Sequence, residues 1–136
     1  MSALDPRPTD DGATPSFPKP AATDGRRRLG TQGEAMAAAW YMANGYQPVA
    51  TNWRCRDGEI DLIVRRARLF VFCEVKTRTS TAFGAPVEAV TRTKQMRLRR
   101  LAARWLQDEC PVHPSALRFD VVSVLAGQVE VVEGAF

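Results

Sequence analysis

Short runs of apolar and aromatic residues, separated by polar turns, dominate the middle of the chain. They cover residues 47–54, 59–64 and 69–76, and runs of this length and composition are typical of β-strands. The second and third runs are separated only by residues 65–68, a connection of hairpin length. The pattern therefore predicts an antiparallel meander of three strands.

A helix is expected before the first strand, over residues 32–44. Thr31 and Glu34 have the spacing of a capping box at its start, and Gly45 is a suitable residue to end it. The stretch 35–43 is apolar on every side, which predicts burial against more than one neighbour.

A second helix is expected from a cap near Thr91 to about Gln107. Apolar residues recur in it at i, i+3, i+4 and i+7, which is the spacing of a core-facing stripe. They are Leu98, Leu101, Ala102 and Trp105. The segment before this helix, residues 77–86, is rich in Thr and Ser and contains Gly and Pro, so a loop is expected there.

Two further strands are expected near the end of the chain, over 117–125 and 128–132, joined by a turn at residues 126–127. The order of elements is then αβββαββ. This order predicts an α/β fold with a mixed sheet of about five strands, at least partly antiparallel and flanked by two main helices.

The first 28 residues differ from the rest of the chain. They carry five of the nine prolines, few large apolar side chains and an arginine run at 26–28. We expect a disordered tail over 1–28 and one folded domain over 29–136. The arginine run is interpreted as a solvated junction rather than a binding element.

Composition narrows the classes of protein further. The chain has 136 residues, 45% of them hydrophobic and 25% charged, as expected for one soluble globular domain. It lacks a membrane-spanning apolar run and a secretory signal, so a cytoplasmic protein without a membrane partner is expected. Three cysteines and a single histidine argue against a disulfide framework, a thiolate zinc site and a multi-histidine zinc site.

Positive charge gathers on the second helix. The net charge is +4, and residues 92–107 include six basic side chains and no acidic one. Arg97, Arg100 and Arg104 form a stripe suited to a phosphate backbone, while Lys94 falls within the apolar stripe and must either snorkel or meet a carboxylate. The loop residues 77–80 offer further donors to phosphate. A solvated basic face is the alternative interpretation.

Acidic residues occur on two neighbouring strands. Asp61 shares a strand face with Glu59, and Glu74 shares one with Lys76. One hairpin register places Asp61 opposite Phe72, with Glu74 one diagonal step away, and a slip of two residues places Asp61 directly opposite Glu74. Either register brings the two carboxylates close together.

Like charges across a sheet are unfavourable unless a cation lies between them. Lys76 and a divalent cation are the candidates, and carboxylate oxygens favour Mg²⁺ or Mn²⁺ over zinc. A metal held by Asp61 and Glu74 could activate water and polarise a phosphodiester, with Lys76 orienting that water or stabilising negative charge. An exposed strand face whose charges pair off is the alternative. Glu34 is equally compatible with capping alone and with reaching this cluster.

In combination, the motifs resemble those of the YraN-like family of bacterial proteins. They are LGTQGE at 29–34, GEIDLI at 58–63, FCEVKTR at 72–78, FG at 83–84, KQ at 94–95, RFDVV at 118–122 and AF at 135–136. The resemblance covers residues 29–136 and implies a restriction-endonuclease-like fold with a PD-(D/E)xK nuclease core, related in outline to archaeal Holliday-junction resolvases. It implies that Asp61, Glu74 and Glu34 surround the metal, with Lys76 beside them. The usual proline of the first motif is absent, since 58–60 is Gly-Glu-Ile.

These observations predict a Mg²⁺-dependent or Mn²⁺-dependent DNA endonuclease that acts on branched or irregular DNA. Its catalytic residues would be Glu34, Asp61, Glu74 and Lys76. Its nucleic-acid contacts would be Arg78, Lys94, Arg97, Arg100 and Arg104. A nucleic-acid-binding protein that keeps the fold without cutting is the alternative, and a scaffold protein is a third. Assembly as a homodimer is left open.

Overall fold

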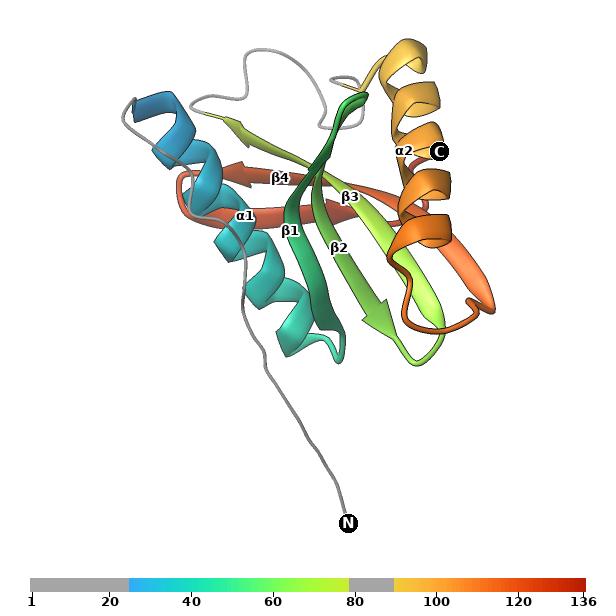
Figure 1. The fold of residues 1–136 in the computed structure, drawn as a ribbon. Helices are drawn as coiled ribbons and strands as arrows, with labels where there is room; N and C mark the ends of the chain where they lie inside the picture. The colour runs from blue at the N-terminus through green and yellow to red at the C-terminus, as the bar shows by residue number, and fades with distance from the viewer. Residues whose placement is uncertain (1–24, 79–89) are drawn as a thin grey trace.

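The computed structural model describes residues 25–78 and 90–136. A five-stranded sheet forms the centre of the fold (Figure 1). The strands lie side by side in chain order. They are β1 (Gln47–Cys55), β2 (Gly58–Arg66), β3 (Leu69–Arg78), β4 (Ala116–Leu125) and β5 (Gln128–Val132). Neighbours are antiparallel except β3 and β4, which are parallel. The predicted tail up to residue 24 and the predicted loop from residue 79 lie outside the described residues.

The two helices cover opposite faces of this sheet, α1 (Gly25–Ala43) on one and α2 (Arg92–Asp108) on the other (Figure 1). A parallel pair needs a long crossover, and α2 lies in the segment that connects β3 to β4. Among the described residues, neither helix combines the length and apolar character that a membrane crossing requires. The predicted order αβββαββ and the mixed sheet with two flanking helices are confirmed.

Prediction is most accurate for α2. Its N-cap is Thr91, whose hydroxyl accepts a hydrogen bond from the Lys94 backbone N–H at 3.3 Å, as expected of a threonine cap. All four residues of the predicted stripe are buried. They pack with Phe70, Phe72 and Phe119 in one core cluster. This apolar stripe fixes which face of α2 meets the sheet.

Prediction of α1 is wrong in two respects. The helix begins at Gly25, so Thr31 lies inside it rather than at the N-cap position, and residues 25–28 of the predicted tail are helical. Arginine is a good helix former, which the interpretation of 26–28 as a junction ignored. The helix is also buried on one side only, because Met42 is 54% exposed and Ala35 is exposed. Alanine favours helix without adding much hydrophobic area, so an alanine-rich sequence is a poor indicator of burial on every side.

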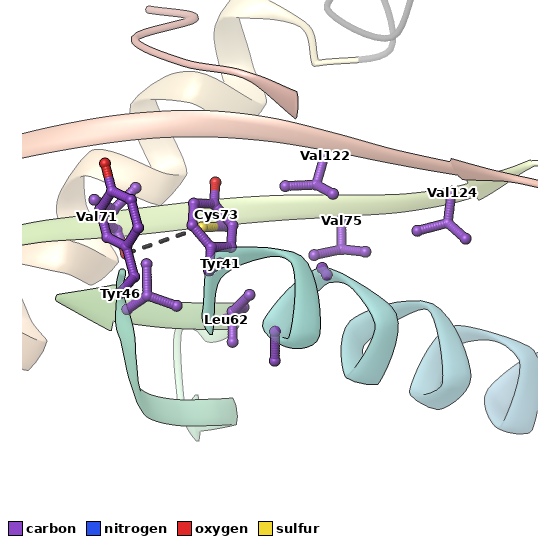
Figure 2. Close-up of a cluster of buried hydrophobic side chains, with 11 residues drawn as sticks. Tyr41, Tyr46, Leu62, Val71, Cys73, Val75, Val122 and Val124 are labelled. Atoms are coloured by element: carbon purple, nitrogen blue, oxygen red, sulfur yellow. Dashed lines mark hydrogen bonds between the residues drawn. The ribbon is translucent and has the colours of Figure 1, made fainter. Parts of the chain in front are cut away.

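The buried side of α1 packs on the opposite face of the sheet from α2. Figure 2 shows Val75, Val122 and Val124 pointing from β3 and β4 toward α1. Ala37 and Tyr41 of α1 belong to the same cluster and are fully buried. The sheet therefore separates two apolar layers, one under each helix.

A buried carboxylate connects this layer to the C-terminal segment through hydrogen bonds. Asp120 on β4 is 0% exposed and accepts hydrogen bonds from Tyr41 Oη at 2.6 Å, from Arg118 Nε and Nη2 at 2.9 Å each, and from the Gly134 backbone N–H at 3.0 Å. A buried charge is tolerated when it is paired and hydrogen-bonded in this way. Asp120 is therefore a structural acid that links α1, β4 and the C-terminal segment.

Candidate functional site

The register between β2 and β3 decides how the two predicted carboxylates meet. Arg66 pairs with Leu69 and Leu62 with Cys73. Continued by one residue beyond this last pair, the same register would set Asp61 opposite Glu74. Of the two registers expected, the slipped one is therefore adopted, with the turn at residues 67–68 and a positive φ of 53° at Ala67. Asp61 Oδ2 also accepts a hydrogen bond from the backbone N–H of Val75 at 2.9 Å.

Three carboxylates from two elements converge beside this pair. Glu34 of α1 and Glu59 and Asp61 of β2 each place a carboxylate oxygen so that all three atoms lie within 4.8 Å of one another. Glu34 therefore reaches the acidic cluster, the alternative that sequence spacing could not separate from capping. Glu59 was not among the predicted ligands, although its place two residues before Asp61 on the same strand face was a usable signal. We refer to Glu34, Glu59, Asp61 and the neighbouring Glu74 as the carboxylate cluster.

Burial and mutual repulsion perturb this cluster strongly. Burial raises the pKa of Glu34 to about 7, and the nearby charge of Glu59 adds to the rise, while a hydrogen bond with the Asn52 side chain opposes it. Burial also raises the pKa of Asp61, and the charge of Glu74 raises it further. Carboxyls in such surroundings retain their protons at unusually high pH unless a cation compensates them.

Basic residues stand close to Glu74. Burial raises the pKa of the Glu74 carboxyl, and the charges of Lys76, Lys94 and Arg97 oppose that rise. Lys94 thus lies near a carboxylate, one of the two outcomes expected for a lysine in the apolar stripe. The predicted E-x-K pair is together in space, with both side chains half-buried.

A pocket of about 480 Å³ opens over these groups, between α2 and the hairpin of β1 and β2. Its acidic lining is Glu59, Asp61 and Glu74. Its basic lining is Arg54, Arg56, Lys94 and Arg97. Two of the predicted nucleic-acid contacts, Lys94 and Arg97, therefore stand at the pocket itself. Arg54 of β1 and Arg56 of the β1–β2 turn, which the predicted contact set did not include, stand there too.

The three remaining predicted nucleic-acid contacts differ in exposure and in ion pairing. Arg100 is exposed on α2, whereas Arg104 forms ion pairs with Asp57 at 3.2 Å and with Asp108 at 3.4 Å. The absence of acidic residues within 92–107 therefore does not leave Arg104 without acidic partners, because Asp57 comes from the β1–β2 turn and Asp108 follows the predicted helix end. Arg78 is half-buried at the last position of β3.

The residue before Arg78 also departs from prediction. Thr77, expected in a loop that donates to phosphate, belongs to β3 and lies against Gly33 of α1. Its hydroxyl is buried and has no hydrogen-bond partner among the described residues. It is therefore a packing residue at the junction of α1 and the sheet.

A further residue of the site could not be recognised from sequence. Asn52 lies inside β1 with a positive φ of 52°, a conformation that is uncommon outside glycine and for which asparagine is among the enriched residues. Its side chain forms a hydrogen bond with the side chain of Glu34. Unusual backbone of this kind often marks a functional site.

Comparison with known proteins agrees with the family resemblance. The sequence profile described as "Uncharacterised protein family UPF0102" matches residues 33–124. A UPF0102 protein of Beutenbergia cavernae is 55% identical over 71% of this chain and 81% of its own. One from Frankia alni is 49% identical over 79% and 93%, and one from Saccharophagus degradans is 43% identical over 79% and 91%.

Proposed function

The chain belongs to the uncharacterised protein family UPF0102, and we propose that it is a divalent-metal-dependent nuclease that hydrolyses phosphodiester bonds in DNA. The observation that carries this proposal is the convergence of Glu34, Glu59 and Asp61 within 4.8 Å, beside Glu74 and the basic lining of one pocket. Acidic and basic groups set side by side suit a metal ion together with a phosphate.

The donor set fits a hard cation. It consists of carboxylate oxygens only, the ligands that Mg²⁺ and Mn²⁺ prefer. Burial, together with the charge of Glu74, raises the pKa of Asp61, and a bound cation would oppose both effects. When bound, the cation would polarise a phosphodiester and lower the pKa of water. Glu34, Glu59, Asp61 and Glu74 are the residues that would hold it.

Basic side chains near the cluster and at the pocket have separate roles in this proposal. Lys76 stands near Glu74, where its ammonium can orient water or stabilise charge that develops on the phosphate. Lys94 and Arg97 line the pocket and can hold phosphate oxygens. Their charges supply affinity for a polyanion without reading base sequence.

We also assign the fold to the restriction-endonuclease-like type. Asp61 on one strand, Glu74 and Lys76 on the antiparallel neighbour, and Glu34 on the first helix correspond to the parts that the PD-(D/E)xK pattern requires. The proposed substrate within this class is branched or irregular DNA, contacted through its backbone.

A second function is favoured by one observation. Arg54 already pairs with Glu59 at 3.3 Å, so part of the acidic charge is compensated by the protein itself. If cations of the chain replace the metal, the protein binds nucleic acid without cutting it. The same experiment separates the two functions.

The experiment measures cleavage of single-stranded, duplex, flap and four-way DNA with Mg²⁺ or Mn²⁺. We expect metal-dependent cleavage that is abolished by Asp61→Asn and by Glu74→Gln and retained by Glu130→Gln, which removes an exposed carboxylate on β5. Equal cleavage by the parent and both site variants would refute the assignment. Salt-sensitive DNA binding without cleavage by the parent would favour the second function.

A further inference from the structure

A glycine of α1 faces a threonine of β3 in close contact. Gly33 is buried in α1, and a Cβ added to it would overlap Thr77 Oγ1 and stand 3.4 Å from Thr77 Cβ. Glycine is a poor residue for a helix interior. Its presence at this point is explained by the contact, since no larger residue fits unless the helix or the strand moves.

Thr77 cannot easily yield to a larger neighbour. It is β-branched, so two of its three χ1 rotamers place a heavy atom, the hydroxyl oxygen or the methyl carbon, at any given position beside Cβ, and the choice among rotamers is restricted. Its Oγ1 is buried and has no hydrogen-bond partner in the part of the chain that the structure describes. Because hydrogen bonding does not account for this hydroxyl, the contribution of Thr77 lies in its volume against the glycine.

The next residue of α1 belongs to the carboxylate cluster. Glu34 is 9% exposed, and its oxygen lies within 4.8 Å of ligand atoms of Glu59 and Asp61. Those two residues stand on β2, so the distance between helix and sheet determines whether Glu34 reaches them. Metal–oxygen distances tolerate deviations of only about 0.2 Å, whereas an added methyl group would displace the helix by more.

We propose that Gly33 and Thr77 are positioning residues whose contact sets the depth of Glu34 in the carboxylate cluster. The inference rests on the proposed function, because it assigns the contact a role in metal binding. Neither residue touches the metal or the substrate. They act through the spacing between α1 and β3.

The test is Mn²⁺ affinity measured by calorimetry, with helix content followed by circular dichroism. Gly33→Ala should weaken Mn²⁺ binding by about tenfold or more, as is typical when the support of a ligand is removed, with helix content unchanged. Adding Thr77→Ala should restore affinity, because the overlapping oxygen is gone. Adding Thr77→Val should not restore it, since valine keeps the volume of threonine.

Two controls separate positioning from general damage. Ala39→Gly at an exposed position of α1 changes helix propensity without altering this contact, so it should leave Mn²⁺ affinity unchanged. In a Glu34→Gln background, Gly33→Ala should cause no further loss, because both changes remove the same ligand.

The outcomes distinguish this inference from the proposed function. Failure of the parent chain to bind Mn²⁺ would refute the proposed function and, with it, the positioning role. Mn²⁺ binding by the parent with unchanged affinity in Gly33→Ala would refute the positioning role alone. Rescue by Thr77→Val as complete as that by Thr77→Ala would also overturn it, since volume would then not be the cause.

Discussion

Replacing Glu34 by glutamine should stabilise the metal-free protein several times more at pH 8 than at pH 5. The folded protein holds the pKa of Glu34 at about 7 against an ordinary value of 4.5. Between these values the folded state binds more protons than the unfolded state, so stability falls as pH rises. Glutamine carries no such charge and can keep the hydrogen bond with Asn52.

The size of the effect follows from the same values. The difference between 4.5 and about 7, at about 1.36 kcal/mol per pH unit, sets a ceiling of roughly 3.4 kcal/mol. Solvent screening and local relaxation keep the effect of one charge below this ceiling, so we expect Glu34→Gln to gain roughly 1–2 kcal/mol over the parent at pH 8. Saturating Mn²⁺ should reverse the order, because the parent alone keeps all its ligands.

The assay is urea unfolding in a chelator at pH 5 and pH 8, with Glu130→Gln as the matched control for loss of an exposed carboxylate. The control should follow the parent at both pH values. Equal destabilisation of Glu34→Gln at pH 5 and pH 8 would refute the reasoning, because it would show a structural role that does not depend on the charge of Glu34.

Three further predictions concern single interactions. Tyr41→Phe removes the 2.6 Å hydrogen bond to buried Asp120, and urea unfolding should show a loss of about 1.5–3 kcal/mol; a loss below about 0.5 kcal/mol would contradict the buried network. Arg97→Gln should make the slope of log K against log salt for binding to duplex DNA shallower by about 0.9. Arg104→Gln should change this slope less, because Arg104 is engaged in ion pairs. Equal changes in the two variants would show that these ion pairs open when DNA binds. Asn52→Gly suits a positive φ, so it should lower the free energy of unfolding less than Asn52→Ala does. Both variants lose the hydrogen bond to Glu34, so both should bind Mn²⁺ more weakly. Unchanged Mn²⁺ affinity in both variants would exclude Asn52 from the site.

Local signals were sufficient to predict most of the fold. The strands, the Thr91 cap and the α2 stripe follow from patterns within a few residues, and such patterns reflect the local backbone and side-chain periodicity. The start of α1 was mispredicted because two signals conflicted there. A capping-box spacing at Thr31 pointed to a start, while the arginines before it favour helix, and the observed helix includes them.

The site was predictable in its chemistry but not in its geometry. Asp61, Glu74 and Lys76 could be chosen from strand alternation, whereas the register that sets them opposite one another depends on the turn at Ala67. The partnership of Arg104 with Asp57 joins residues far apart in sequence. Such contacts depend on tertiary packing, and the hydrophobic periodicity of the sequence does not predict them.

The central claim is that the carboxylate cluster holds a divalent metal. Anomalous X-ray diffraction from crystals grown with saturating Mn²⁺ tests it directly, because the anomalous signal locates manganese without reference to activity. The account predicts a peak within coordination distance of Asp61 and of at least one of Glu34, Glu59 and Glu74, and its loss in Asp61→Asn crystals. A pocket without a peak at saturating Mn²⁺, or a peak that persists unchanged in Asp61→Asn, would contradict it.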